Sequence, residues 1–195
     1  WPLEDIAQIS FVDIWFLQEI EKSFNVSSEN TPSSVLKMLG WTEEDLDSKE
    51  TKKALENNRV YKLVDTCSAE FESQTPYLYS TNGVSSDDIT SDKKKVVVIG
   101  SGPNRIGQGI EFDYCCVHGI SSLKENGFEA IMINSNPETV STDYDTADKL
   151  YFEPLTWREV KSVLNREKPD SVIIQLGGQT PLKLAENISK EGFQI

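Results

Sequence analysis

Short apolar runs alternate with helix-like segments along the second half of the chain. The first run, Lys95–Gly100 (KVVVIG), has the continuous apolar character of a buried strand. Similar runs follow at Ala130–Asn134, Lys149–Phe152 and Ser171–Gln175 (SVIIQ). The intervening segments have helical spacing or a helix-start signal: Ile110–Asn126, with Phe112, Cys116, Ile120 and Leu123 on one face, then Thr156–Glu167, then a segment opened by Pro181. This alternation predicts an α/β fold in which a parallel sheet is covered by helices on both faces.

The first half of the chain has a helical pattern instead. From Val12 to Phe24, the apolar residues Ile14, Leu17 and Ile20 recur at steps of three, as on one face of a helix. Further short helices are predicted over Thr31–Gly40, from Thr42 onward and over Ser48–Asn57. We therefore expect a small, mainly helical segment before the α/β domain.

A polar segment separates the two patterns. Residues Thr81–Asp92 are rich in Asn, Gly, Ser and Asp, a composition typical of linkers. We place the helical segment at residues 1–80, the linker at 81–94 and the α/β domain at 95–195. Because Phe193–Ile195 resembles the start of another strand and the chain has no initiator methionine, we expect it to be a piece of a longer protein.

Charge and cysteine content exclude several functions. Of the net charge of −13, residues 1–92 contribute −11 and residues 93–195 only −2. Without a basic stripe, nucleic acid is not an expected partner. No apolar run approaches the ~20 residues of a membrane helix, so we expect a cytoplasmic protein with no membrane partner. Cys67, Cys115 and Cys116 have no metal-ligand spacing, and we expect reduced thiols and no metal site.

The loop after the first predicted strand is rich in glycine. Gly100–Gly109 (GSGPNRIGQG) leads into a helix, and such loops let the backbone approach a ligand at the helix N-terminus. The spacing does not fit a dinucleotide fingerprint, because Arg105 stands where the third glycine is required. The acidic residue expected after the second strand is also missing, since that strand ends in Asn134. NAD or FAD binding is therefore disfavoured.

Longer strings in the chain are far more specific than this loop alone. They are GSGPNRIGQGIEFDYCCVH (Gly100–His118), NPETVSTDYDTADKLYFEP (Asn136–Pro154) and GGQTPL (Gly177–Leu182). These strings closely resemble the large subunit of bacterial-type carbamoyl phosphate synthetase, at the start of its second half. Tyr61–Cys67 and Tyr77–Thr81 are similar to the segment that precedes that half, whereas residues 1–59 fit by position more than by sequence.

The resemblance implies a fold, a reaction and partners. The fold would be a Rossmann-like pre-ATP-grasp domain, preceded by the end of an oligomerization domain. The parent enzyme would make carbamoyl phosphate from bicarbonate, ammonia that a glutaminase small subunit releases from glutamine, and two ATP. ATP and magnesium, with potassium as a possible further ion, would be bound by the rest of the large subunit, including the ATP-grasp domain. We expect this piece alone to bind no cofactor tightly and to catalyse nothing.

The resemblance also implies roles for individual residues. Gly109, Glu111 and Glu138 match family positions that line the passage of carbamate, the intermediate that travels between the two halves. A simpler interpretation exists for Glu111, because an acid in the first turn of a helix is favoured by ~0.3–1 kcal/mol without any function. Glu138 would otherwise be a solvated loop acid. The remaining glycine-loop residues would order the loop or face the adjoining domain: Gly102, Asn104, Arg105, Gly107 and Gln108.

Several interpretations remain open. The only histidine, His118, lies in mid-helix without a nearby acid–nucleophile pair, and we expect a packing role in the core or an interface. The Gly177–Gly178 turn is expected to be a tight strand–helix connection. Alternatives for the whole chain are the leading domain of another ATP-grasp ligase, of the biotin carboxylase or purine-pathway type, and a stand-alone Rossmann-like binding module.

Overall fold

The computed structural model of the protein describes residues 1–26, 31–32, 35–36, 41, 59–66, 70, 75–82, 85–89 and 91–195. These residues fall into two compact units, one of Trp1–Val60 with Thr81–Ser85 and one of Tyr61–Ser80 with Ser86–Ile195. The helices predicted from Thr42 onward and over Ser48–Asn57 lie outside the described residues, and so does most of the helix predicted over Thr31–Gly40.

Two helices open the first unit. α2 (Ile14–Phe24) confirms the prediction, and the Asp13 side chain caps it by accepting a hydrogen bond from the N–H of Trp15 (2.8 Å). α1 (Leu3–Ser10) was not predicted. The two helices are separate because Phe11 adopts a left-handed conformation (φ 58°), which ends α1.

The second unit is built on a six-stranded sheet with the order β1-β2-β5-β4-β3-β6. The strands are β1 (Arg59–Leu63), β2 (Tyr77–Asn82), β3 (Lys95–Ile99), β4 (Glu129–Asn134), β5 (Lys149–Phe152) and β6 (Ser171–Ile173). β2–β5, β5–β4, β4–β3 and β3–β6 are all parallel pairs. The carboxyl ends of these strands therefore lie at one edge of the sheet.

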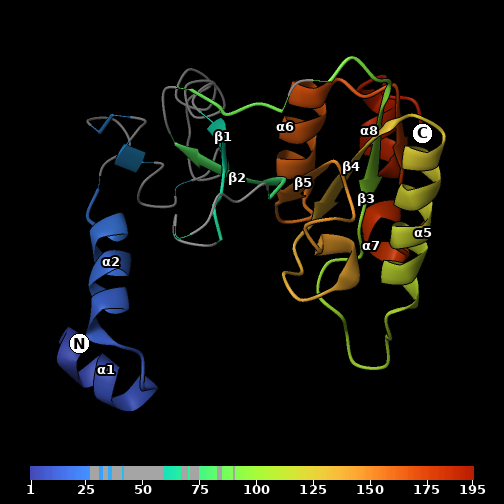
Figure 1. Cartoon of the computed structure of the whole chain (residues 1–195). Coiled ribbons are helices and arrows are strands. Elements are labelled where there is room, and N and C mark those ends of the chain that lie inside the picture. Colours follow the sequence, from blue (N-terminus) through green and yellow to red (C-terminus); the bar gives the residue numbers. More distant parts are fainter. Residues whose placement is uncertain are drawn as a thin grey trace. The chain divides into compact units, whose positions relative to one another are not determined.

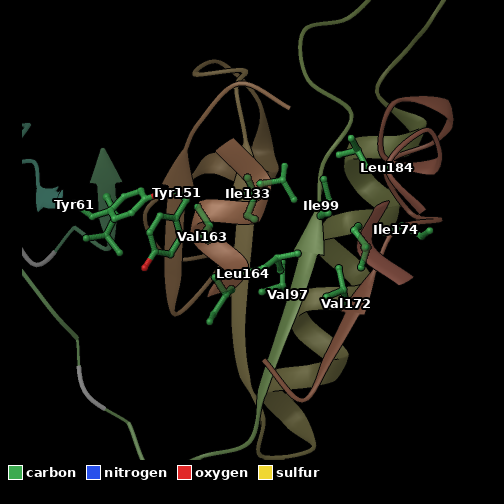
Figure 2. Close-up of a cluster of buried hydrophobic side chains, with 14 residues drawn as sticks. Tyr61, Val97, Ile99, Ile133, Tyr151, Val163, Leu164, Val172, Ile174 and Leu184 are labelled. Atoms are coloured by element: carbon green, nitrogen blue, oxygen red, sulfur yellow. The ribbon is translucent and has the colours of Figure 1, made fainter. Parts of the chain in front are cut away.

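Helices cover both faces of this sheet, as predicted (Figure 1). α5 (Glu111–Glu125) packs Cys116 and Ile120 on one face, against Val98, Met132 and Leu150. The other face carries α6 (Trp157–Glu167) and α8 (Ala185–Lys190), with the short α7 (Gln179–Leu182) between β6 and α8. Figure 2 shows the apolar core on that second face: Tyr61, Val97, Ile99, Ile133, Tyr151, Val163, Leu164, Val172, Ile174 and Leu184. The mixed α/β architecture confirms the predicted Rossmann-like fold class.

The sheet reaches further into the first half of the chain than the sequence indicated. β1 and the first part of β2 lie in residues 1–80, which we described as helical, and β2 ends inside the segment that we called a linker. Tyr61 and Leu78 explain why: both are buried in the core of the second unit. Smaller differences occur at the other end of the chain. The strand predicted over Ser171–Gln175 stops at Ile173. The N–H of Val172 in this strand donates a hydrogen bond to the backbone carbonyl of Gln194 (2.8 Å).

A buried charged cluster occupies the amino edge of the sheet. The fully buried Lys149 lies 3.1 Å from Glu167 and 3.4 Å from Glu129, at the starts of β5 and β4 and the end of α6. Lys95 also contacts Glu167 (2.9 Å), and the Tyr151 hydroxyl donates a hydrogen bond to the same carboxylate. Buried charges are tolerated only when they are paired in this way.

Candidate functional site at the carboxyl edge of the sheet

The glycine-rich loop begins directly against the ends of β3 and β4. Gly100 donates its N–H to the carbonyl of Ile133 (2.9 Å), and a Cβ added at Gly100 would lie 2.6 Å from Cγ of Asn134. Gly102 and Gly107 have positive φ angles of 73° and 84°, a conformation that glycine adopts without strain. The sequence therefore keeps bare backbone where the loop leaves the sheet and where it turns.

The connection from β6 to α7 runs against the same strand end. A Cβ at Gly177 would lie 2.4 Å from the carbonyl oxygen of Ile99, closer than real atoms approach. Gly178 has φ 71°, and a Cβ there would meet the ring of Phe112 at 3.0 Å. The pair is thus a tight strand–helix connection, as the sequence indicated, and it brings Gln179 and Thr180 beside the glycine loop.

A cavity of about 340 Å³ lies between the glycine loop, the start of α5 and α7. It is lined by Arg105, Ile106, Gly107, Gln108, Gly109, Glu111, Phe112, Gln179 and Thr180. The Glu111 carboxylate folds back over Gly109, where an added Cβ would lie 2.7 Å from Oε2. One guanidinium and one carboxylate therefore share a cavity with amide, hydroxyl and backbone groups, a lining suited to a small polar molecule.

The structure brings five of the predicted residues together in this cavity: Arg105, Gly107, Gln108, Gly109 and Glu111. Asn104 is exposed on the loop and does not line the cavity. Gly102 is buried, does not line the cavity and donates its N–H to the Asn134 side chain (3.0 Å). In this chain Glu111 is exposed, and its first-turn position on α5 agrees with the prediction.

Glu138 lies on a different loop, between β4 and the 3₁₀ helix η2 (Val140–Thr142), and does not line the cavity. Its side chain is exposed, and its N–H donates to Oδ1 of Asn136 (3.1 Å). The hydroxyl of Thr142 donates to the carbonyls of Asn136 (3.1 Å) and Thr139 (2.8 Å). The loop that carries Glu138 is therefore held by its own hydrogen bonds.

We assigned no site role from the sequence to several polar residues that hold or line this edge: Asp113, Asn134, Ser141, Gln179 and Thr180. Asp113 could have been found because it shares a helical face with Cys116 and Ile120, so a carboxylate there is buried. Asn134 ends an otherwise apolar strand, which is also a signal. Gln179 and Thr180 come close only through the tight turn before them, which spacing along the chain does not reveal.

Thiol and imidazole chemistry are not built into this edge. Burial, followed by the nearby carboxylate of Asp113, raises the pKa of the Cys116 thiol to about 12, so it stays protonated and unreactive at neutral pH. His118 is exposed on α5 with Tyr114 as its ring neighbour, so the expectation of a core position was wrong and an interface role is untested. Among the described residues, no three His, Cys, Asp or Glu side chains form a group that could hold a metal ion. No described helix is long and apolar enough to cross a bilayer.

A parallel α/β sheet with a glycine-rich loop over a polar cavity at its carboxyl edge defines a Rossmann-like domain that lacks the dinucleotide fingerprint. The family model of the carbamoyl phosphate synthase preATP-grasp domain matches residues 92–195. The chain belongs to this family.

Relatives from three domains of life support the assignment. The chain is 47% identical to the carbamoyl phosphate synthase large chain of Thermotoga neapolitana, covering 99% of this chain and 19% of that protein. It is 44% identical to the large chain of Archaeoglobus fulgidus (99% and 20%). It is 48% identical to the chloroplastic arginine-specific large chain of Oryza sativa subsp. japonica (94% and 17%). The chain thus spans about a fifth of the length of the curated relatives it matches.

Proposed function

We propose that the chain is part of the large subunit of a glutamine-hydrolysing carbamoyl phosphate synthase. It would contain the end of the oligomerization domain and the pre-ATP-grasp domain of the second half, the half that forms carbamoyl phosphate. Its own contribution would be a wall of the passage through which carbamate reaches the second ATP-grasp site. The family match and relatives that align over nearly the whole chain support this proposal.

The observation that carries the passage proposal is the polar cavity beside the glycine loop. Gly109 leaves room for the Glu111 carboxylate to fold back toward the loop, and both residues line the cavity. Carbamate decomposes in water, so an enzyme that uses it as an intermediate has to move it through a shielded space. A concave, polar surface at the carboxyl edge of a parallel sheet is suited to be one side of such a space, with the adjoining domain as the other.

The proposal assigns the other components to the rest of the enzyme. ATP and Mg²⁺, with K⁺ as a possible further ion, would bind in the ATP-grasp domains, and the glutaminase small subunit would supply ammonia. The proposal places no magnesium site in this chain. The purified 195-residue chain should therefore show no ATP hydrolysis above a buffer blank; measurable turnover would contradict this part.

A carboxylate in the wall constrains the form in which the intermediate moves. The carbamate anion would be repelled by an ionised Glu111, although Arg105 in the same cavity carries the opposite charge. Carbamic acid, which is neutral, would pass both side chains. The proposal therefore includes two forms of the intermediate, the carbamate anion and carbamic acid. A Glu111→Gln variant, which removes the charge and keeps the shape, distinguishes them. Faster product formation by this variant indicates that the anion moves.

The test of the passage uses the full-length large chain that contains this sequence, with its small subunit. Carbamoyl phosphate and bicarbonate-dependent ATP hydrolysis are measured together for wild type, Glu111→Ala and Glu138→Ala. We expect both variants to keep hydrolysing ATP while less carbamoyl phosphate is formed per ATP, because carbamate escapes and decomposes. The matched control is Glu125→Ala, which removes an exposed glutamate from the opposite end of α5.

Two results would count against the proposal. If Glu111→Ala and Glu138→Ala form as much product per ATP as the wild type and Glu125→Ala, the passage does not run along this edge. If the wild type forms no carbamoyl phosphate, the proposed reaction itself is wrong.

A further inference from the structure

One buried side chain joins the two loops of the candidate site. Asn134, at the end of β4, is fully buried, and its Oδ1 accepts hydrogen bonds from the N–H groups of Gly102 (3.0 Å) and Ser135 (2.9 Å). Its Nδ2 donates to Oγ of Ser141 in η2 (3.2 Å). The carboxamide thus binds the glycine loop with one end and the loop after Glu138 with the other.

Asp113 connects this arrangement to the helix that begins with Glu111. Asp113 lies in the first turn of α5 with only 3% of its surface exposed, and its Oδ2 accepts a hydrogen bond from the N–H of Ser141 (3.0 Å). Ser141 is therefore held from two sides, by Asn134 through its hydroxyl and by Asp113 through its backbone. The chain of contacts runs from the glycine loop through β4 and η2 to the start of α5.

Burial of the Asp113 carboxylate costs free energy, and a specific contact has to offset this cost. Its Oδ1 has no hydrogen-bond partner in the described part of the protein, and an unsatisfied buried oxygen costs about 1–3 kcal/mol. An acid in the first turn of a helix also gains from the helix dipole when it is exposed, by about 0.3–1 kcal/mol. The favourable contribution specific to this buried carboxylate is the bond that fixes Ser141.

Gly100 also constrains the position of the Asn134 side chain. A Cβ at Gly100 would lie 2.6 Å from Cγ of Asn134, so the carboxamide packs directly on the bare backbone of residue 100. The backbone at this point and the Asn134 side chain are matched to one another.

We propose that Asn134 and Asp113 are positioning residues for the carbamate passage. They touch no intermediate; they hold the loop of Glu138 at a fixed distance from the glycine loop and from the Glu111 end of α5. This inference rests on the proposed function. Loss of either residue would let the two loops separate and open the wall to water, so that carbamate leaks while the ATP sites remain intact.

The experiment uses the full-length large chain with its small subunit and measures carbamoyl phosphate formed per bicarbonate-dependent ATP hydrolysed. Asn134→Ala and Asp113→Ala should lower this ratio at least about tenfold, since displacements of ~1 Å have such effects on positioned groups. ATP hydrolysis itself should stay within about twofold of the wild type. Asp113→Asn should retain the ratio, because the oxygen of its carboxamide can accept the same N–H of Ser141.

Two further variants separate positioning from general destabilisation and from failure of the passage proposal. Tyr151→Phe removes a buried hydroxyl that bonds Glu167 and Arg166 at the opposite edge of the sheet. It should lower the thermal midpoint without changing the ratio. Glu138→Ala reports on the passage itself, because it removes a proposed wall residue and leaves the hydrogen-bonded chain intact.

The outcomes are distinct. If Glu138→Ala leaks and Asn134→Ala and Asp113→Ala do not, the positioning role is overturned and the passage stands. The proposal is also overturned if Tyr151→Phe lowers the ratio as much as Asn134→Ala does, or if Asp113→Asn lowers it as much as Asp113→Ala does. In either case the effect does not come from the hydrogen bonds to Ser141. If Glu138→Ala also stays coupled, the passage proposal fails and the positioning role fails with it.

Discussion

At the scale of single residues, two glycines near the candidate site are required for different reasons. Gly177 has no room for a side chain, since a Cβ would lie 2.4 Å from a backbone oxygen that cannot move aside. Gly107 has open space around it, with nothing within 4 Å of an added Cβ, and is needed only for its positive φ of 84°. The first requirement comes from packing and the second from backbone conformation.

This difference predicts unequal effects of the same substitution. Gly177→Ala should lower the free energy of unfolding by about 3 kcal/mol, because the β6–α7 connection must move away from β3. Gly107→Ala should cost only about 1–2 kcal/mol. Urea unfolding of the 195-residue chain, followed by circular dichroism, measures both values. Equal midpoints for the two variants would show that the close approach at Gly177 is not real.

The predictability of the site from the sequence also differs residue by residue. Gly109 and Glu111 could be selected because they belong to a motif that is contiguous in the sequence, and the structure places both in one cavity. Asn134 and Asp113 could not be joined in advance, because they meet only through Ser141, at sequence separations of 7 and 28 residues. Long-range contacts of this kind depend on how strands and helices are packed, which spacing along the chain does not state.

At the scale of elements, the buried charged cluster at the amino edge of the sheet depends more on Glu167 than on Glu129. Burial opposes the ionisation of Glu167 most strongly, but hydrogen bonds from Tyr151 and Lys95, together with the charge and hydrogen bond of Lys149, outweigh it and lower its pKa below the usual range. Burial also acts on Glu129, and there the attraction of Lys149 and Lys95 does not compensate, so its pKa is raised. Oε2 of Glu129 has no hydrogen-bond partner among the described residues.

The two glutamates should therefore respond differently to substitution by glutamine. Glu167→Gln leaves Lys149 and Lys95 without their shared partner and should destabilise the chain by about 3–5 kcal/mol at pH 7. Glu129→Gln leaves Lys149 paired with Glu167 and should cost clearly less. Chemical denaturation at pH 7 compares them, and a larger loss for Glu129→Gln would reverse the assignment.

The same pair predicts how stability depends on pH. A carboxyl with a lowered pKa stabilises the fold above its usual value of 4.5, and this contribution is lost as the pH falls through the lowered pKa. The raised pKa of Glu129 works in the opposite direction, since its contribution falls as the pH rises above 4.5. Glu167→Gln should flatten the loss of stability in acid, and Glu129→Gln should steepen it. Unfolding free energies measured between about pH 3 and pH 7 test both slopes.

Element boundaries followed from the sequence where an uninterrupted apolar run or a helical pattern marks the element. Lys149–Phe152 was predicted to the residue, and the helix at Trp157–Glu167 to within one residue of its start. β1 and β2 are longer than β5, but their apolar residues are mixed with polar ones such as Lys62 and Ser80, so no continuous apolar run marked them as strands. Their place in the sheet is set by pairing and by the burial of Tyr61 and Leu78, both tertiary effects.

At the scale of the whole molecule, the folding unit is larger than the part that matches the family model. The match covers residues 92–195, whereas the sheet also includes β1 and β2. Tyr61 packs edge-on against Tyr151 (centroids 5.1 Å apart) and its hydroxyl donates to Ser162 (2.9 Å). Ser80 donates its N–H to the Glu153 carboxylate (2.8 Å). These contacts tie the early strands to β5 and α6.

Truncation tests this view of the folding unit. A chain of residues 59–195 should unfold cooperatively, with a core that still contains Tyr61 and Leu78. A chain of residues 92–195 should be several kcal/mol less stable, because the loss of two large buried side chains costs about 2–5 kcal/mol each and β5 becomes an open edge. Thermal unfolding and light scattering compare the two. Equal midpoints and equal solubility would show that β1 and β2 add nothing to the fold.

The strand order β1-β2-β5-β4-β3-β6 has a consequence for how the protein is made. During synthesis on the ribosome, β2, β3 and β4 all emerge before β5, yet β5 is the strand that lies between β2 and β4. A nascent chain that has not yet exposed Lys149–Phe152 therefore has two separate pieces of sheet and a gap between them. The two pieces can join only when this four-residue strand emerges, and a nascent-chain chaperone would find its binding surface in that interval.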